Sequence, residues 1–505
     1  MPPGRLERVD EMRVRPLDVP AWSLAQVVQA VPGATASGEA TVTGISLSTR
    51  DVVAGDLFAA LPGATTHGVR FAAQALEAGA VAVLTDAEGA AELAEDVPRV
   101  VVDRPRARLA EFAADFYGRP SDRFTTIGVT GTQGKTTTTY LAEAALGESR
   151  AAVIGTIGTR ITGRPAASSL TTPEAPALQA LFAVMAEEQV AACAMEVSSH
   201  AIVQGRVDGF VLDAAVFLNL GRDHLDFHHD VESYFAAKAE LFTPAHARRA
   251  VINLDDEHGR RLTGLTSLPV TTFSTEGAAA DWRAVNLRAH RTGSVVTLVA
   301  PDGREVELSV PLAGAFNVSN AVAAVVALAG EGHDLQDLVD GIATARGVPG
   351  RMERVDAGQP FTAVVDYAHK PEAVEAVLRA LRPVTAGRLI VVIGAGGDRD
   401  RGKRPLMGEV AARLADVLIV TDDNPRSEDP ALIRAEVLAG AEGGAAQVLQ
   451  VGDRREAIAA AVEQAATGDT VVVAGKGHER GQQVGDVVHP FDDREVLLEL
   501  IGERA

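Results

Sequence analysis

The sequence predicts an α/β protein of three domains, with a doubly wound, mainly parallel sheet in the central domain. At 505 residues the chain is too long for one ordinary hydrophobic core. Hydrophobic residues make up 47% of the chain but aromatic residues only 4%, so its cores consist mainly of small aliphatic side chains. Short apolar runs alternate with Ala-rich helical stretches, which is the pattern of strands joined by crossover helices.

The first segment is predicted to be a small α/β domain at residues 21–111. Residues 1–20 are polar and contain prolines, and we expect them to be flexible. A strand is expected at 41–48, a turn at 54–56, a helix at 71–80 and a strand at 81–85.

The central domain is predicted at residues 112–346. An apolar run at 123–131 leads into a Gly-rich turn, and further strands are expected at 151–156, 192–197, 214–220 and 250–255. Helical stretches separate most of them, which favours a parallel sheet. Residues 281–312 differ, because two alternating runs flank Asp302-Gly303 and predict a β-hairpin.

The third domain is predicted at residues 347–505, after a linker at 347–350, with a Rossmann-like arrangement. Its strands are expected at 363–369, 389–397, 417–424 and 470–479. The run that starts at Gly394 is not a G-x-G-x-x-G dinucleotide motif, because Arg399 stands at the third glycine position. Polar groups follow the carboxyl ends of most predicted strands, where open α/β sheets bind ligands.

Charge and cysteine content exclude several classes of protein. The net charge of −21 argues against a general binder of nucleic acids or membrane surfaces. Cys193 is the only cysteine, so no intrachain disulfide can form, and its apolar surroundings predict a buried, inert thiol. Without a signal peptide or an apolar run of about 20 residues, we expect a cytoplasmic protein that does not insert into membranes.

A Gly-rich phosphate loop follows the first central strand. Its Lys135 can pair with the β- and γ-phosphates of a nucleotide, and the Thr136 hydroxyl can ligate Mg²⁺. The loop is a variant, because Val129 stands where the strict pattern requires glycine, and an ordinary strand-to-helix turn is the alternative. The sequence therefore predicts ATP binding by Gly131, Thr132, Gln133, Gly134, Lys135, Thr136 and Thr137.

Acidic and histidine residues follow two other central strands. Glu196 ends one strand shortly before His200, and a carboxylate near a triphosphate usually acts through Mg²⁺. The alternative for this segment is a helix cap at Ser198 or Ser199. Residues 221–230 contain three histidines and three aspartates, but no cysteine or HExxH spacing indicates zinc, and His228 and His229 are interpreted as solvated.

Lys238 lies in a predicted amphipathic helix that includes Tyr234, Phe235, Leu241 and Phe242. By itself the pattern favours a lysine whose ammonium group reaches the solvent while its stem covers the apolar face. The neighbouring Ala237 and Ala239 leave room around the side chain.

Together these residues resemble the Mur ligase family, and within it the UDP-N-acetylmuramoyl-tripeptide synthetases. The matching segments occur in order over most of the chain, and their combination is more specific than any single one. They are GTQGKTT, the Thr171-Thr172 pair before Pro173-Glu174, MEVSSH, VQGR, LNLGRDHLD, YFAAK, FNVSNA, GRME, DYAH, GAGGDRDRGKRP, DNPR and GKGHE.

The resemblance implies a metal and nucleotide site. Lys238 matches a lysine that CO₂ converts into a carbamate, an anionic oxygen ligand, which would replace the solvent-reaching interpretation. Glu196 and His224 match Mg²⁺ positions, with Thr136 on the nucleotide side. The residues that match the ATP site across the domain boundary are Asn317, Arg351, Asp366 and His369.

The resemblance also implies two substrate sites. The UDP-muramoyl peptide would contact Thr49 and Arg50 in the uridine-binding N-terminal domain, and Thr171, Thr172, Ser198, Gln204 and Arg206 in the central domain. Residues that match a site for meso-diaminopimelate are Arg399, Asp423, Asn424, Pro425, Arg426, Gly475 and Glu479.

The chemistry of diaminopimelate supports this assignment. Its distal carboxylate suits the bidentate fork of Arg426, and Glu479 could bind its ammonium group. L-lysine has no distal carboxylate and would gain nothing from Arg426. The alternative for Arg426 is an arginine that caps a surface turn.

Three positions depart from the family pattern. Gln133 replaces the usual Asn of the phosphate loop, Leu170 stands where an Asn often precedes the threonine pair, and Lys370 follows His369 where Thr is common. None of the three removes a group that the chemistry requires.

The implied reaction is amide-bond formation in peptidoglycan synthesis through an acyl phosphate, in which Lys135 and Mg²⁺ neutralise the γ-phosphate. His200, His369 or solvent would accept the proton, and the linker at 347–350 would serve as a hinge. We expect a monomer that acts on small molecules, namely ATP, the UDP-muramoyl dipeptide and diaminopimelate. The alternatives are the same reaction with L-lysine, a sister ligase such as a folylpolyglutamate synthetase or the dipeptide-adding Mur enzyme, and a P-loop NTPase coupled to binding or assembly.

Overall fold

The computed structural model describes residues 11–63, 66–168, 170–290 and 293–504. The chain forms two compact units. Unit 1 comprises Met1–Leu220, His228–Phe273 and Ala323–Asp334, and unit 2 comprises Gly221–Phe227, Ser274–Val322 and Leu335–Ala505. The boundaries expected at 21–111, 112–346 and 347–505 stay predictions.

The segment before residue 20 makes specific contacts in unit 1. Met12 is buried and forms a β-bridge with Ala166. The Arg13 guanidinium forms an ion pair with Glu187, and the Arg15 guanidinium forms one with Asp56. Residues 1–20 were expected to be flexible, but three residues of the second half of this segment make specific contacts. Residues 1–10 lie outside the described residues.

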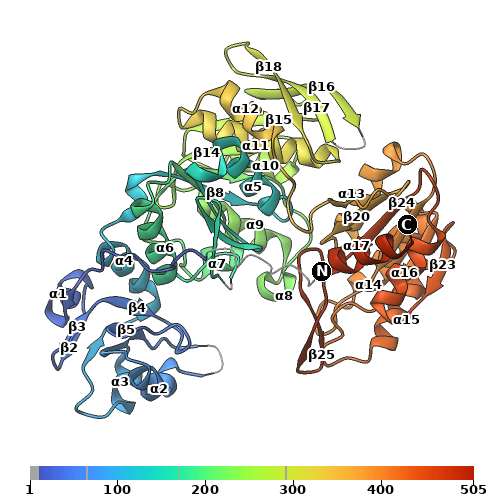
Figure 1. Cartoon of the computed structure of the whole chain (residues 1–505). Helices are drawn as coiled ribbons and strands as arrows, with labels where there is room; N and C mark the ends of the chain where they lie inside the picture. Colours follow the sequence, from blue (N-terminus) through green and yellow to red (C-terminus); the bar gives the residue numbers. More distant parts are fainter. Residues whose placement is uncertain (1–10, 64–65, 169, 291–292, 505) are drawn as a thin grey trace, which may run out of the picture. The chain divides into compact units, whose positions relative to one another are not determined.

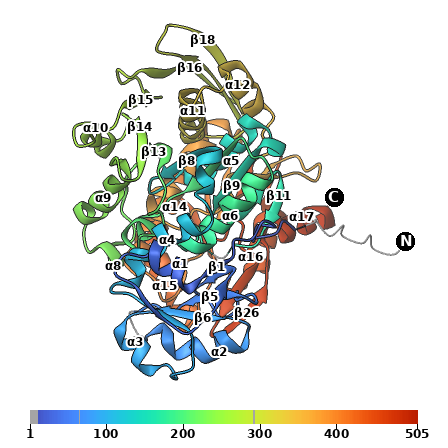
Figure 2. The same cartoon turned by 90° about the vertical axis from the view of Figure 1, so that its left-hand side faces the viewer.

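The first sheet of unit 1 has the strand order β2-β7-β6-β5-β4, in which only β2 is antiparallel (Figures 1 and 2). Leu57 and Leu84 pack with α1 and α4, whereas the neighbouring Phe58 and Val83 pack with α2, because successive side chains of a strand face opposite sides. The elements are β1 (Trp22–Ser23), α1 (Leu24–Ala30), β2 (Thr35–Ser37), β3 (Thr41–Val42), β4 (Gly44–Ser46), β5 (Asp56–Ala59), α2 (Ala72–Glu77), β6 (Ala82–Thr85), α3 (Ala87–Glu92), β7 (Arg99–Val101) and α4 (Pro105–Phe116).

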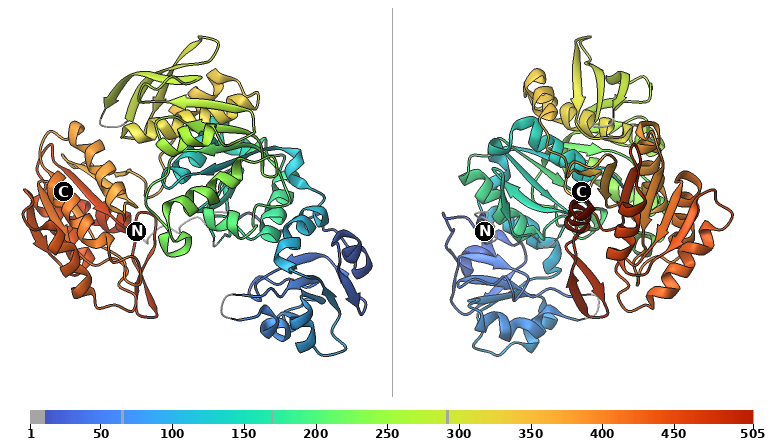
Figure 3. Two further views of the ribbon diagram at one scale, coloured as in Figure 1. Left: turned by 180° about the vertical axis from the view of Figure 1, so that it is seen from behind. Right: turned by 45° about the vertical axis from the view of Figure 1, so that its right-hand side comes forward.

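The central strands of unit 1 follow the order β11-β10-β9-β12-β8-β13-β14-β15 (Figures 1 and 3). Strands β9, β12, β8, β13, β14 and β15 run parallel, while β10 and β11 form an antiparallel hairpin that was not predicted from the sequence. The strands are β8 (Thr125–Thr130), β9 (Ala151–Gly155), β10 (Gly158–Ile161), β11 (Arg164–Ala166), β12 (Ala192–Glu196), β13 (Leu212–Phe217), β14 (Ala247–Asn253) and β15 (Val270–Ser274).

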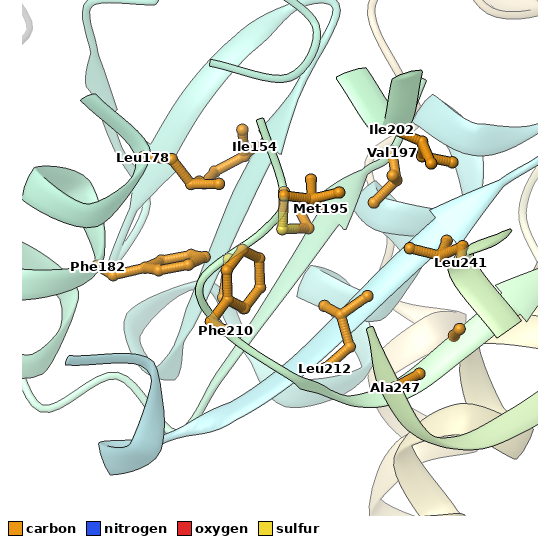
Figure 4. Close-up of a cluster of buried hydrophobic side chains, with 14 of the residues drawn as sticks. Ile154, Leu178, Phe182, Met195, Val197, Ile202, Phe210, Leu212, Leu241 and Ala247 are labelled. Atoms are coloured by element: carbon orange, nitrogen blue, oxygen red, sulfur yellow. The ribbon is translucent and has the colours of Figure 1, made fainter. Parts of the chain in front are cut away.

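Helices pack on this sheet over a continuous apolar core (Figure 4). Met195 of β12 lies among Leu178, Phe182 and Phe210, beside Leu212 of β13. Cys193 is buried in the same cluster, as predicted, and burial raises the pKa of its thiol, so it remains protonated. The helices are α5 (Lys135–Leu146), α6 (Ala175–Glu187), α7 (Ser199–Val203), α8 (Leu225–His228), α9 (Val231–Ala239) and α10 (Glu257–Thr263).

Unit 2 begins with an antiparallel meander of β16 (Trp282–His290), β17 (Gly293–Val299) and β18 (Glu305–Val310). Strands β17 and β18 form the hairpin predicted around Asp302-Gly303, where Gly303 adopts a φ of +85°. The meander is followed in the chain by α11 (Ala315–Gly330) and α12 (Leu335–Ala343).

The last sheet of unit 2 has the strand order β19-β20-β24-β21-β22-β23, and all its strands except β19 run parallel (Figures 1 and 3). Helices α13, α14 and α15 cover one face and α16 and α17 the other. The elements are β19 (Glu353–Val355), β20 (Thr362–Asp366), α13 (Pro371–Leu381), β21 (Leu389–Ile393), α14 (Lys403–Leu414), β22 (Val417–Val420), α15 (Pro430–Ala441), β23 (Gln447–Gln450), α16 (Arg454–Gln464), β24 (Thr470–Ala474), β25 (Gly481–Val484), β26 (Val487–Pro490) and α17 (Asp493–Arg504).

The predicted doubly wound α/β class is confirmed by these layers. Strands β24, β21 and β22 are neighbours and parallel, so the loops that follow them lie at one edge of the sheet. None of the helices in the described parts of the chain combines the length and apolar character needed to cross a membrane.

Candidate active site

The phosphate loop joins β8 to α5 in unit 1. Gly134 precedes α5 with a φ of +88°, a conformation that glycine adopts without steric cost. The backbone N–H groups of Thr132 and Gln133 donate to Asn219 Oδ1 at 3.1 and 2.9 Å. Asn219 therefore fixes the first half of the loop, a role that the sequence analysis did not assign although it quoted the LNLGRDHLD segment.

Two lysines donate to one carbonyl of this loop. The ammonium groups of Lys135 and Lys238 lie 2.7 and 3.1 Å from the Gly131 carbonyl oxygen. Lys238 also lies 4.6 Å from the centre of the Tyr234 ring and is only 1% exposed. Its interpretation as a solvent-reaching lysine is wrong, because α9 turns the side chain of Lys238 toward the phosphate loop.

Glu196 ends β12 beside β9. Its two carboxylate oxygens accept hydrogen bonds from the Thr156 N–H at 2.8 Å and the Thr156 hydroxyl at 3.1 Å. A side chain at Gly155 would place its Cβ 2.2 Å from Glu196 Oε1, so only glycine leaves room for the carboxylate. Both donors are neutral, which fixes the carboxylate and preserves its charge for a cation.

Oxygen ligands suited to Mg²⁺ are present in unit 1, in Glu196 and in the buried Thr136 at the start of α5. The described residues contain no group of three His, Cys, Asp or Glu side chains arranged to bind a metal. Of the other two predicted ligands, Lys238 belongs to unit 1 and His224 to unit 2. The set of Thr136, Glu196, His224 and Lys238 therefore stays a prediction.

The predicted peptide-binding residues of the central domain form one hydrogen-bonded group. Thr171 Oγ1 lies 3.1 Å from Thr156 Oγ1, and Thr172 Oγ1 donates to the Glu196 carbonyl oxygen at 2.9 Å. The Ser198 N–H donates in turn to Thr172 Oγ1 at 3.2 Å. This group adjoins the Glu196 carboxylate through the shared residue Thr156.

Arg206 completes the group. Its guanidinium donates to the Thr172 carbonyl oxygen at 3.1 Å and to Gln204 Oε1 at 2.6 Å, and it forms an ion pair with Glu174 at 3.1 Å. Ser198 also caps α7, since its hydroxyl accepts from the Ala201 N–H at 3.2 Å. The capping alternative is thus confirmed, and it leaves the predicted binding role of Ser198 open.

The predicted uridine-binding residues lie in the loop after β4. Arg50 is exposed and Thr49 is half-buried, and the Arg50 N–H donates to the Ser48 hydroxyl at 3.2 Å. Leu170, where an Asn was expected, is 39% exposed. The uridine site stays a prediction.

Two histidines lie near the start of α7. The rings of His200 and His228 are 5.7 Å apart, and His228 Nε2 lies 2.8 Å from the Ser199 hydroxyl. His228 is buried, so its interpretation as solvated is wrong, whereas His229 is exposed. Tyr234 lies 4.9 Å from the His228 ring, and its hydroxyl lies 3.3 Å from Thr132 Oγ1, which links α7 with the phosphate loop.

In unit 2, Asp366 ends β20. Its carboxylate accepts from the N–H groups of Met352 and Ala368 at 2.7 and 2.8 Å. Burial raises the pKa of Asp366, although the Arg351 charge opposes the shift. The Arg351 guanidinium lies 4.4 Å from the centre of the Tyr367 ring, and Asn317 is buried in α11.

His369 is half-buried beside the same tyrosine. Its Nδ1–H donates to the Tyr367 carbonyl oxygen at 2.7 Å, since a carbonyl can only accept. Burial, with the Lys370 charge, lowers the pKa of His369 to about 3. So weak a base is poorly suited to remove a proton near neutral pH, which argues against this candidate for proton acceptor.

His224 lies in the segment of unit 2 that precedes α8. Its Nε2 is 3.1 Å from Asp223 Oδ2, and Lys370 forms an ion pair with the same oxygen. The departure at position 370 therefore provides a positive charge that binds the carboxylate next to the predicted metal ligand.

The predicted diaminopimelate residues lie mainly at one edge of the last sheet. Asn424 Nδ2 donates to Glu479 Oε2 at 2.8 Å. Gly475 has a φ of +118°, and a Cβ there would lie 2.7 Å from Asp423 Oδ2. That oxygen is buried without a hydrogen-bond partner in the described part of the chain, so its capacity to accept a hydrogen bond is not used there.

Arg426 follows in the same loop with a φ of +52°. Its guanidinium donates to the Gly397 carbonyl oxygen at 2.6 Å, and its backbone forms a β-bridge with Val484. Pro425 before it is buried, whereas Arg399 is exposed in the loop after β21. The structure thus groups Asp423, Asn424, Arg426, Gly475 and Glu479, and leaves Arg399 facing solvent.

Comparison with known proteins gives matches over most of the chain. Three family models match successive segments: "Mur ligase family, catalytic domain" at residues 41–117, "Mur ligase middle domain" at 129–328 and "Mur ligase, glutamate ligase domain" at 350–477. The chain is 54% identical over 496 residues to a protein of Streptomyces avermitilis, which covers 96% of this chain and 98% of that protein. It is 46% identical over 456 residues to a protein of Pseudomonas aeruginosa, which covers 89% and 93%.

Both relatives are named UDP-N-acetylmuramoyl-L-alanyl-D-glutamate–2,6-diaminopimelate ligase. A solved structure of a ligase with that name is 37% identical, covers 92% of this chain and 95% of its own, and has a TM-score of 0.65. A MurF structure from Acinetobacter baumannii, with a TM-score of 0.69 over 96% of this chain and 99% of its own, is 19% identical and shows the shared fold alone.

Proposed function

The chain belongs to the Mur ligase family, and on that premise we propose that it is the ATP-dependent ligase that adds meso-2,6-diaminopimelate to UDP-N-acetylmuramoyl-L-alanyl-D-glutamate in peptidoglycan synthesis. The new amide bond forms at the side-chain carboxylate of D-glutamate. ADP and inorganic phosphate leave.

The arrangement of charges at one edge of the last sheet of unit 2 is the observation that favours diaminopimelate as the amino acid. Arg426 lies in the same loop as Asp423, and Asn424 in that loop is hydrogen-bonded to Glu479. A diamino diacid presents a carboxylate and an ammonium group at its distal end, and both find a partner of opposite charge among these residues. L-lysine would leave Arg426 without its carboxylate, which disfavours lysine.

The nucleotide is assigned to the phosphate loop. Lys135 neutralises the γ-phosphate, and Thr136 and Glu196 supply oxygen ligands for Mg²⁺, together with His224 and Lys238 in the proposed set. Mg²⁺, when bound, lowers the negative charge on the phosphates that the incoming carboxylate meets. Asn317, Arg351 and Asp366 are proposed to contact the same nucleotide.

The reaction proceeds in two steps at positioned groups. The D-glutamate carboxylate oxygen attacks the γ-phosphorus, the bond to the ADP oxygen breaks, and an acyl phosphate forms. The diaminopimelate amine then attacks the acyl carbon, phosphate leaves, and the amine loses a proton. His200, His369 or solvent accepts that proton, and the low pKa of His369 favours the other two.

Lys238 is proposed to lose its ammonium proton and then, as the neutral amine, to form an N–C bond with CO₂, which gives a carbamate and releases a second proton. As an ammonium group it shares the Gly131 carbonyl oxygen with Lys135, and two positive charges on one acceptor repel each other. A carbamate removes this repulsion and supplies an anionic oxygen. We expect Lys238→Ala to lose at least about 100-fold in kcat and to regain activity with a short carboxylate, and full activity without one would contradict the proposal.

The reaction is assigned to the cytoplasm, where ATP is available, and to a monomer. Light scattering coupled to gel filtration tests the second assignment. A mass that matches one chain of 52.6 kDa supports it, and a mass of twice that value contradicts it.

The deciding experiment measures phosphate release from ATP with the UDP-muramoyl dipeptide, comparing meso-diaminopimelate with L-lysine. Turnover with diaminopimelate alone supports the proposal. Turnover with lysine keeps the ligase but overturns the role of Arg426. Turnover in the absence of both amino acids favours an NTPase.

A further inference from the structure

Lys476 is a buried cation at the amino-acid edge of unit 2 that the reaction described above does not use. It lies in the loop after β24, between Gly475 and Glu479, and its side chain is fully buried. Its ammonium nitrogen lies 3.1 Å from Asn424 Oδ1, 3.2 Å from Glu479 Oε2 and 2.6 Å from the Gly481 carbonyl oxygen. An ammonium group has three donors, so these three acceptors satisfy it completely.

The first of these contacts fixes the orientation of the Asn424 amide. Asn424 Oδ1 accepts from Lys476 and also from the Gln483 N–H at 2.9 Å. Both partners can only donate, so the amide oxygen must face them and the NH₂ group must face Glu479. A flipped amide would place two donors against the Lys476 ammonium.

The second contact fixes the Glu479 carboxylate. Glu479 Oε2 accepts from Lys476 and from Asn424 Nδ2, so this oxygen has two protein donors. The Glu479 side chain is still 32% exposed, which leaves the carboxylate accessible to a ligand. Its charge is thus placed by Lys476 without being enclosed.

The third contact attaches the β25–β26 ribbon. Gly481 begins β25, and Val484 at the end of that strand forms the β-bridge with Arg426. The Arg426 N–H also donates to the Gln483 carbonyl oxygen at 3.1 Å. One buried ammonium group therefore contacts all three segments that carry Asn424, Glu479 and the strand next to Arg426.

We propose that Lys476 is a positioning residue for the incoming amino acid: it fixes Asn424 as a donor and Glu479 as an acceptor for the polar end of a diamino diacid. The proposal rests on the proposed function and deepens it. Lys476 is fully buried, so it acts through these side chains and does not touch the substrate.

The test is Lys476→Met in the full-length enzyme, because Met keeps the length of the stem and removes the ammonium group. We expect the KM for diaminopimelate to rise about tenfold or more, as for the loss of a charge-assisted hydrogen bond. The KM values for ATP and the UDP-muramoyl dipeptide should stay within about twofold, as expected for sites that do not share these partners.

Arg388→Met is the matched control. Arg388 precedes β21 and forms an ion pair with Asp469, which immediately precedes β24, at the opposite end of the same strands. The substitution removes a cation of unit 2 at the end of β24 that is opposite the amino-acid edge, so all three KM values should remain unchanged. Equal rises of all three KM values in Lys476→Met, with a lower melting temperature, would indicate a merely structural role and overturn the proposal.

Coupling to Asn424 provides an independent measure. If Lys476 acts through Asn424 and Glu479, its substitution in an Asn424→Ala, Glu479→Ala background should change the diaminopimelate KM by less than about twofold. If the fold-change in the diaminopimelate KM caused by the Lys476 substitution is the same in this background as in the wild type, the proposal is overturned.

A second single variant covers the case in which Lys476→Met does not fold. Asn424→Asp keeps an acceptor for Lys476 but removes the donor, so it should fold and raise the diaminopimelate KM; an unchanged KM would overturn the proposal. Wild-type enzyme without diaminopimelate-dependent turnover would instead overturn the proposed function.

Discussion

At the residue scale, Gly155 determines whether the Glu196 carboxylate fits. Glycine is required there by close packing alone, because its Cβ position lies 2.2 Å from Glu196 Oε1. The residue ends β9, and the carboxylate is bound by the next residue, Thr156. Sequence patterns mark such a glycine only as part of a strand end.

We expect Gly155→Ala to lower kcat by about 100-fold, because a displacement of about 1 Å in a reacting site has that effect. Steady-state turnover with saturating substrates measures it. Gly264→Ala is the control, since its nearest atom, the Arg261 carbonyl oxygen, is 3.6 Å from the added Cβ. A variant at position 155 with normal kcat would show that Glu196 does not need its present position.

Glu143 is a second residue with a measurable consequence. It is buried in α5, and the Arg160 Nε lies 3.1 Å from its Oε1. Burial raises the pKa of Glu143 to about 7, although Arg160 opposes the shift. Between the ordinary glutamate pKa and this value, the folded state binds a proton that the unfolded state has released.

The stability that Glu143 contributes should therefore be complete below about pH 4.5 and decrease up to about pH 7, by as much as about 3 kcal/mol. Glu143→Gln has no carboxyl group to titrate at this position, so its melting temperature relative to that of the wild type should increase as the pH rises across that range. Glu148→Gln removes an exposed carboxylate from the same arginine and a minor cause of the raised Glu143 pKa, so it should change the profile much less than Glu143→Gln. A constant difference between Glu143→Gln and wild type would contradict the assignment.

At the scale of elements, two adjacent arginines connect α16 to α17 in different environments. Arg454 and Asp493 are both fully buried and form an ion pair at 2.7 Å. Arg454 also donates to the Ala474 carbonyl oxygen at the end of β24, at 3.0 Å. Arg455 pairs with Glu499 at 3.0 Å, but both side chains are largely exposed.

Arg454→Met should destabilise unit 2 by about 3–5 kcal/mol, because it leaves the Asp493 charge buried without its partner. Arg455→Met should cost less than about 1 kcal/mol. Urea unfolding followed by circular dichroism compares the two variants. Equal effects would show that Asp493 is protonated or hydrated in the absence of Arg454.

The same scale shows which elements a sequence can predict. Strands β12, β21 and β24 are buried along their whole length and β8 is buried except at Thr125, so mainly apolar runs identified them. Strands β23 and β26 are mostly exposed, β25 is mostly half-buried, and none of the three was predicted from the sequence, because they lack such buried runs.

The candidate site was predictable only in part, for a related reason. The sequence itself indicated Lys135 in a loop after a strand and Glu196 at the end of one, whereas Arg426 was identified by resemblance and by the fit of its guanidinium to a distal carboxylate. Lys238 was identified by resemblance alone, since its ammonium group contacts the carbonyl oxygen of Gly131, which lies 107 residues away in the sequence. Lys476 was missed, because a lysine in a Gly-rich loop gives no local sign that its ammonium group is buried against Asn424, which is distant in the sequence, as well as against Glu479 and Gly481.

At the scale of the whole molecule, chain order does not follow the compact units. Gly221–Phe227 belongs to unit 2, although the residues on both sides of it in the sequence belong to unit 1. The LNLGRDHLD segment is therefore divided: Asn219 supports the phosphate loop of unit 1, whereas His224 and Asp223 pair within unit 2. Such a division arises from tertiary contacts that no local pattern encodes.

Net charge sets a second property of the whole molecule. The chain carries −21 at pH 7, while the proposed ATP and UDP-muramoyl substrates are anions. At an ionic strength of about 10 mM the Debye length is about 30 Å, so the charge of the entire chain repels them, whereas at about 150 mM it is about 8 Å and only nearby cations act. At fixed Mg²⁺, kcat/KM for the UDP-muramoyl dipeptide should therefore rise with added NaCl over this range, with no rise in a sucrose control of equal osmolality. A fall in kcat/KM with added NaCl would mean that local cations such as Lys135 and Arg206 outweigh the net charge of the chain at long range. In that case the site attracts the approaching substrate, and the net charge of the chain does not repel it.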